Sequence, residues 1–175
     1  DSTPHAVRLA NPITTRDWVT HRYEVEHEAW HGAPLRIVQI TDLHVHPVFP
    51  LEYYENVLRV AEQAKPDIVV FTGDFLTKLD SLERLRKVLR PVGGAVNLAV
   101  LGNHDYWAGP DLVRAVIRES GLKLLTYESI RLDIRGQKVT VTGYDYPWGK
   151  QDMTFPPREA GALHVVLSHT PDNIF

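Results

Sequence analysis

Short apolar runs alternate with amphipathic segments along most of this 175-residue chain. Four runs rich in Val and Ile predict buried strands of a sheet covered on both faces, and they cover residues 35–41, 68–72, 95–101 and 163–167. Apolar residues at helical spacing predict helices over 51–61, 79–89 and 110–117. The order strand, helix, strand, helix, strand, helix predicts parallel pairing with right-handed crossovers.

The remaining segments show weaker patterns. Residues 122–126 and 130–134 read as strands, and residues 138–142 pair back across Arg135-Gly136-Gln137 as a hairpin, which predicts a second sheet or an antiparallel edge. Residues 19–30 alternate as a half-exposed strand does. Residues 1–17 lack periodicity and read as a loosely packed arm, and residues 144–162 read as a long loop, which in a compact domain is often functional.

Polar residues follow directly after the four buried strands. They stand in four blocks, Asp42-Leu43-His44, Gly73-Asp74, Gly102-Asn103-His104-Asp105 and Ser168-His169. In an open α/β sheet, ligands bind outside the carboxyl ends of the strands. Two of these aspartates, the asparagine and the three histidines are therefore expected to converge on one rim, which is the layout of a metal centre.

Size, charge and cysteine content limit the domain organisation and the classes of ligand that the chain can bind. With 43% hydrophobic residues the chain can bury one core and reads as one domain, with an N-terminal arm and edge strand over 1–34 and the main body over 35–175. A net charge of −3 gives no general attraction to nucleic acid or to anionic membrane, so a phosphate-bearing ligand must be held locally. The absence of cysteine excludes thiolate metal sites and disulfides.

The four blocks resemble those of the calcineurin-like metallophosphoesterase family. The sequence that flanks them is most similar to a bacterial branch of this family, which includes cell-envelope phosphodiesterases and UDP-diacylglucosamine hydrolases. The resemblance implies a layered α-β-β-α metallophosphoesterase sandwich. It also implies two divalent ions (Mn, Fe, Zn, Ni or Co) that hold a bridging hydroxide for in-line attack on a phosphoester, most simply a phosphodiester or pyrophosphate. The implied metal ligands are Asp42, His44, Asp74, Asn103 and His169, with Asp74 between the ions.

The resemblance gives the two residues after Asn103 other roles. His104 would contact the phosphate and protonate or stabilise the leaving oxygen rather than bind metal. Asp105 would either orient His104 or bind a backbone amide. The family's next block, Gly-His-x-His, does not occur before Phe175. We therefore expect the chain to be the N-terminal two-thirds of the domain, apparently truncated at its C-terminus and less able to bind metal and turn over substrate alone.

Several features have plainer interpretations. The histidines at 5, 21, 27, 31 and 46 read as solvated, although His46 lies on the same rim as His44 and stays a candidate for substrate contact, and His164 reads as partly buried. Tyr106, Trp107, Tyr144, Tyr146 and Trp148 are candidates for a pocket wall or for packing. The leucines of 79–89 read as core, with Arg84, Arg86, Lys87 and Arg90 as a solvated face.

Alternatives remain open for function. UDP-diacylglucosamine pyrophosphate hydrolysis in lipid A synthesis is one, and a non-catalytic scaffold on the same fold is another. The substrate is a phosphoester, lipid-linked or nucleotide-linked among other options, and membrane association would need a segment outside this chain. The sequence leaves the oligomeric state open, and localisation open between bacterial cytoplasm and cell envelope.

Overall fold

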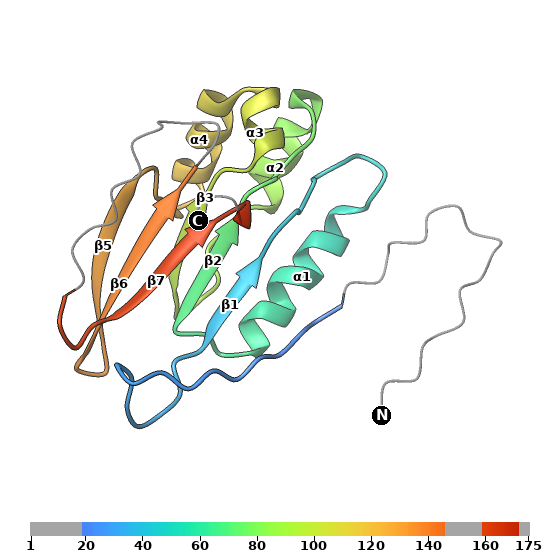
Figure 1. Cartoon of the computed structure of the whole chain (residues 1–175). Helices are drawn as coiled ribbons and strands as arrows, with labels where there is room; N and C mark the ends of the chain where they lie inside the picture. Colours follow the sequence, from blue (N-terminus) through green and yellow to red (C-terminus); the bar gives the residue numbers. More distant parts are fainter. Residues whose placement is uncertain (1–18, 146–158, 172–175) are drawn as a thin grey trace.

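The computed structural model describes residues 19–145 and 159–171. Its first sheet is parallel and has the order β1-β2-β3-β4, of which the first three strands are labelled in Figure 1. The strands are β1 (Ile37–Ile40), β2 (Ile68–Thr72), β3 (Val96–Val100) and β4 (Lys123–Leu124). The predicted α/β fold with a parallel sheet is confirmed, and the expected strand over 122–126 is reduced to two residues.

Helices cover one face of this sheet (Figure 1). They are α1 (Leu51–Gln63), α2 (Leu82–Val88), α3 (Asn103–Ala108) and α4 (Pro110–Glu119). The helix expected over 79–89 begins as a separate 3₁₀ turn, η1 (Leu79–Ser81). Leu85 and Leu89 are buried in the core under this layer, so the leucine pattern belongs to packing. Among the described helices, none combines the length and the apolar character needed to cross a membrane.

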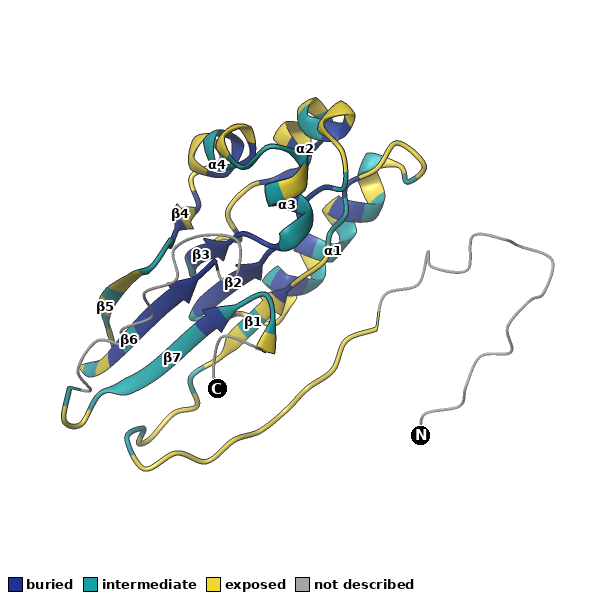
Figure 2. Cartoon of the chain, turned by 45° about the horizontal axis from the view of Figure 1, so that its top comes forward, coloured by how far each residue is buried: buried dark blue, intermediate teal, exposed yellow. Residues whose placement is uncertain are grey.

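A second sheet packs on the other face of the first. It has the order β5-β6-β7 and consists of β5 (Glu128–Ile134), β6 (Gln137–Tyr144) and β7 (Leu163–Ser168). The predicted hairpin is the antiparallel pair β5 and β6, and β7 pairs in parallel with β6. Alternate residues of β2 face the two layers, with Val69 and Phe71 toward the helices and Val70 toward the second sheet. Burial on both faces explains why the central strands β2 and β3 are apolar except at Thr72 and Asn97 (Figure 2).

The two sheets approach closely beside the end of β3. A Cβ atom on Gly143 would lie 2.4 Å from Leu125 Cβ and 2.8 Å from Val100 Cγ1. Only glycine allows this approach, which brings the end of β6 against the end of β3. Within the described residues the layers are helices, sheet and sheet, and the second helical layer of the expected α-β-β-α sandwich is not among them.

The structure differs from the sequence-based expectations in two further places. Residues 19–30 form no strand and are almost entirely exposed (Figure 2), because they lie beside no strand edge that could accept their hydrogen bonds. Arg84 does not belong to a solvated face, since its guanidinium donates to the Phe49 carbonyl. The expected arm over 1–17 and most of the loop over 144–162, including Tyr146 and Trp148, lie outside the described residues.

Candidate metal centre

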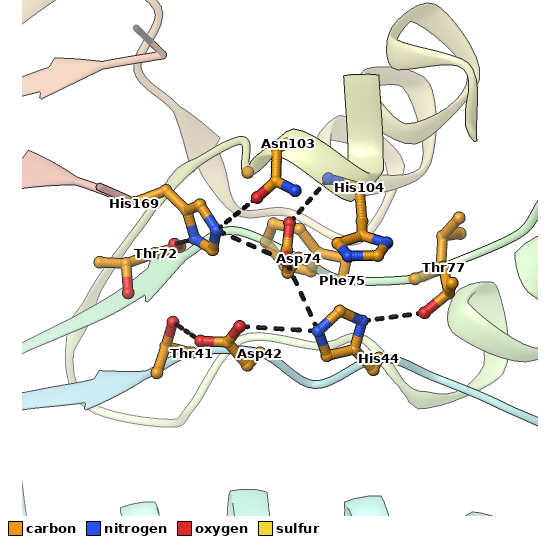
Figure 3. A network of polar contacts seen from close by, with 12 residues as sticks. Thr41, Asp42, His44, Thr72, Asp74, Phe75, Thr77, Asn103, His104 and His169 are labelled. Atoms are coloured by element: carbon orange, nitrogen blue, oxygen red, sulfur yellow. Dashed lines mark hydrogen bonds and ion pairs between the residues drawn. The ribbon is translucent and has the colours of Figure 1, made fainter. Parts of the chain in front are cut away.

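The polar blocks meet at the carboxyl ends of strands from both sheets (Figure 3). Asp42 and His44 follow β1, Asp74 follows β2, and Asn103 begins α3 three residues after the end of β3. His169 follows β7 and reaches the same place from the second sheet. The structure therefore brings together all five residues that the resemblance implies as metal ligands.

The backbone after β1 is fastened to the backbone after β2. The amide of Asp42 donates to the Gly73 carbonyl at 3.1 Å, and the amide of His44 donates to the Asp74 carbonyl at 2.9 Å. Asp42, His44 and Asp74 have φ values of 55°, 40° and 55°, in the left-handed region where non-glycine residues are uncommon. Such backbone strain concentrates at functional sites, where the surrounding structure holds it in place.

Two glycines allow the loops after β2 and β3 to touch. A Cβ on Gly102 would lie 2.2 Å from Asp74 Oδ1, and a Cβ on Gly73 would lie 2.4 Å from the Gly102 amide nitrogen. No side chain fits at either position without moving backbone. The glycines of the Gly-Asp and Gly-Asn-His-Asp blocks are therefore required by the close approach of the two loops.

Asp74 stands at the centre of the cluster and is 3% exposed. Its Oδ1 accepts a hydrogen bond from the His104 amide at 2.9 Å. Its Oδ2 lies 3.5 Å from His44 Nε2 and 3.4 Å from His169 Nε2. Burial disfavours the charged form, but the hydrogen bonds from His169 and the His104 amide outweigh it and lower the pKa of Asp74.

Each imidazole is held through Nδ1 and presents Nε2 to the cluster. His169 Nδ1 donates to the Thr72 carbonyl at 2.8 Å, and His44 Nδ1 lies 2.9 Å from Thr77 Oγ1. A carbonyl accepts only, so Nδ1 of His169 carries a proton, and loss of the second ring proton would leave a lone pair on Nε2 for a metal ion. Metal-binding histidines are oriented in this way, with one ring nitrogen hydrogen-bonded to the protein and the other facing the metal site.

The donor set fits divalent ions. Ligand atoms of Asp42, Asp74 and His169 lie within 4.8 Å of one another, and so do those of His44, Asp74 and His104. Asp74 belongs to both groups, as a bridging carboxylate would. Asn103 Oδ1 lies 3.0 Å from His169 Nε2, beside the first group. His169 Nε2 therefore faces an amide oxygen and a carboxylate oxygen, which favours positive charge there: the same contact with Asp74 raises the pKa of His169 to about 9.

Asp105 is fully buried and lies beneath the cluster. Among the described residues its carboxylate accepts hydrogen bonds from four backbone amides, at 2.9 Å from Asp74, Phe75 and Gly102 and at 3.3 Å from Leu76. Of the two roles considered for it, these contacts match the binding of backbone amides. Burial raises the pKa of Asp105 to about 7. The hydrogen bonds from the backbone amides favour the charged form and partly oppose this rise.

His104 and Trp107 form the open side of the cluster. The His104 ring stands edge-on to the His44 ring with centroids 4.8 Å apart, and edge-on to Trp107 at 4.9 Å. Trp107 is 62% exposed, so this rim faces solvent. Of the other aromatic candidates, the two that the structure describes pack elsewhere, because Tyr144 is 2% exposed and Tyr106 joins a polar network described below.

Most of the remaining histidines lie in exposed positions. His46 accepts a hydrogen bond from the Val48 amide and belongs to neither ligand group. His21, His27 and His31 are exposed, and His164 is half-buried and contacts Thr142. The pattern of residues did not identify Thr72 and Thr77 as partners of the imidazoles, because a backbone carbonyl and a hydroxyl two or three residues from a motif carry no signal of their own.

Comparison with known proteins agrees with this geometry. The family model of the calcineurin-like phosphoesterases matches residues 35–173. The chain belongs to the calcineurin-like phosphoesterase family. This phosphoesterase chain is 33% identical over 135 residues to an uncharacterized metallophosphoesterase of Aquifex aeolicus, with 74% of this chain and 50% of that protein covered.

Two further relatives are named for an activity. The UDP-2,3-diacylglucosamine pyrophosphatase LpxG of Chlamydia trachomatis is 36% identical over 112 residues, covering 56% of this chain and 34% of that protein. The phosphodiesterase YaeI of Escherichia coli is 26% identical over 148 residues, covering 81% of this chain and 55% of that protein. The chain thus spans at most about half the length of these relatives (34–55%).

Proposed function

We propose that the protein hydrolyses a phosphodiester or a pyrophosphate with two divalent metal ions. The observation that carries this proposal is the position of Asp74 Oδ2, 3.5 Å from His44 Nε2 and 3.4 Å from His169 Nε2. A buried carboxylate oxygen between two oriented imidazoles suits a ligand shared by two cations, because its charge offsets their repulsion. The family to which the chain belongs and its phosphodiesterase relative support the same reaction class.

The cluster divides into ligands and a proton donor. Asp42, His44 and Asp74 would hold one ion, and Asp74, Asn103 and His169 the other. When bound, the ions polarise the phosphoryl oxygens and make water nucleophilic at neutral pH. His104, on the open rim, would contact the phosphate and donate a proton to the leaving oxygen. Asp105 would keep the loops after β2 and β3 in place through their amides.

Metal removal tests the proposal. The protein at its full natural length, stripped with a chelator, should hydrolyse bis(p-nitrophenyl) phosphate at the background rate, and Mn²⁺ should restore turnover at a stoichiometry of two ions per chain. The measurements are metal content by elemental analysis and release of p-nitrophenol. Two bound ions with no turnover of phosphodiesters or pyrophosphates would favour the non-catalytic scaffold, and turnover in the stripped protein would contradict the proposal.

A lipid-linked pyrophosphate is the second candidate substrate. Trp107 favours it, because a large apolar side chain is 62% exposed directly beside the His104 ring. An apolar group of the substrate could cover this ring as the phosphate reaches the cluster. The relative LpxG acts on UDP-2,3-diacylglucosamine by its name, which supports the same class. Membrane association through a segment outside this chain is a proposal of the same kind.

Replacing Trp107 tests whether this rim binds an apolar group. Trp107→Ala should raise KM about fivefold to tenfold for UDP-diacylglucosamine, since partial burial of an aromatic ring contributes about 1 kcal/mol or more. KM for a methyl phosphodiester and the metal content should stay unchanged. Leu112→Ala is the matched control, because Leu112 is 50% exposed on α4. An equal rise in KM for both substrates would contradict an apolar subsite at Trp107.

A further inference from the structure

Asp145 is a buried carboxylate outside the candidate metal centre. It follows β6 and is 0% exposed. Its Oδ1 accepts a hydrogen bond from the Leu101 amide at 3.0 Å. Its Oδ2 accepts hydrogen bonds from the hydroxyls of Tyr106 and Thr126, each at 3.2 Å. A buried charge is kept only where such partners compensate for lost water, so its place has a structural or functional reason.

The partners of Asp145 stand on both sides of the Gly-Asn-His-Asp block. Leu101 is the residue directly before Gly102, and Tyr106 is the residue directly after Asp105. One carboxylate therefore joins the entry and the exit of the segment that carries Asn103 and His104. Asp105 fastens the same segment to the loop after β2, and Asp145 fastens it to the second sheet.

Arg114 of α4 completes this network. Its Nη2 donates to the Tyr106 hydroxyl at 2.9 Å and lies 3.9 Å from Asp145 Oδ2. Its guanidinium also stands over the Tyr106 ring, 5.2 Å from the ring centroid. Tyr106 is thus contacted at its hydroxyl by Asp145 and Arg114 and over its ring face by Arg114 of α4.

We propose that Asp145 is a positioning residue for the Asn103–His104 turn, acting through Leu101 and Tyr106. The placement matters for two functions at once, because Asn103 supplies a ligand oxygen and His104 the proposed proton donor. Outer partners of metal ligands typically change metal affinity or activity by about 10–100-fold when removed. This inference rests on the proposed function for its kinetic part, whereas its metal-binding part can be measured without turnover.

The test compares Asp145→Ala with Asn97→Ala. Asn97 is a matched control because it is a buried polar residue at the opposite end of β3, where its amide side chain contacts the backbone of Val92 and Ala95. Both variants should lower the midpoint of thermal unfolding. At a temperature where both are folded, only Asp145→Ala should lower kcat and Mn²⁺ affinity, each about tenfold, with KM nearly unchanged.

Two milder variants cover the case in which Asp145→Ala does not fold. Tyr106→Phe removes only the hydroxyl that joins Asp145 to Arg114, and Asp145→Asn keeps one acceptor for the Leu101 amide. Each should lower Mn²⁺ affinity and kcat severalfold. Unchanged affinity and kcat in the folded variants, or equal losses in Asn97→Ala, would overturn the proposal. If the wild type binds Mn²⁺ without turnover, the proposed function fails. The Mn²⁺ affinities of the variants, measured by titration calorimetry, still decide whether Asp145 positions the turn.

Discussion

Asp74→Ala should remove both metal ions and the hydrolytic activity together. Asp74 is the residue common to both ligand groups, and its buried carboxylate faces both His44 Nε2 and His169 Nε2. Under the proposed function, its loss would leave each of the two ions one ligand short and their mutual repulsion uncompensated. Bound metal ions contribute several kcal/mol to stabilising the transition state, so kcat/KM should fall by at least about 10³-fold.

Asp67→Ala is the matched control for this change. Asp67 stands directly before β2, at the opposite end of the strand from Asp74, and pairs with Arg135. This variant should keep two ions per chain and full activity. The measurements are metal content after dialysis and hydrolysis of bis(p-nitrophenyl) phosphate at saturating Mn²⁺. An Asp74→Ala protein that retains two ions would show that Asp74 does not bridge them.

The central part of the fold could be predicted because its signals are local. Largely apolar runs mark β2 and β3, since both faces of these strands are buried. Alternation of strands and helices implies parallel pairing, which places the residues after each strand on one rim. Chain order alone therefore predicts that Asp42, Asp74 and Asn103 meet.

A regular alternation along the sequence does not show whether a neighbouring strand is available for pairing. For this reason the prediction of a strand over residues 19–30 is wrong. The alternation there is as regular as in a strand, yet the segment lies in solvent without an edge to pair with. Arg84 illustrates the same limit on a helix. Its neighbours in sequence indicate a charged face, whereas the Phe49 carbonyl that it binds comes from the loop before α1.

Details of the site also depend on contacts between distant segments. The left-handed backbone at Asp42 and His44 follows from hydrogen bonds to the loop after β2, some thirty residues away. Asp145 lies more than forty residues from Leu101 and reaches it only because Gly143 lets the two sheets approach. Sequence identified the residues that carry charge and lone pairs, and the tertiary structure decides which of them bind metal and which hold loops.

His104→Ala should separate catalysis from metal binding. The alanine keeps its backbone amide, so Asp74 Oδ1 retains the hydrogen bond that it now accepts from residue 104. Asn103, Asp74 and His169 keep their ligand atoms, and the protein should still bind two ions. Turnover should fall by about 10²–10⁴-fold, the usual contribution of general acid–base catalysis.

A series of leaving groups makes this prediction sharper. If His104 protonates the leaving oxygen, the loss should be larger for phenyl than for p-nitrophenyl esters, because the better leaving group needs less help from a proton. His27→Ala, which changes an exposed histidine of the N-terminal segment, is the control and should match the wild type for both esters. His104 also lies in a ligand group with His44 and Asp74, so metal content decides between the two roles. A His104→Ala protein that loses an ion and keeps its activity per bound metal would make His104 a ligand, whereas two bound ions with a steeper dependence on the leaving group would establish it as the acid.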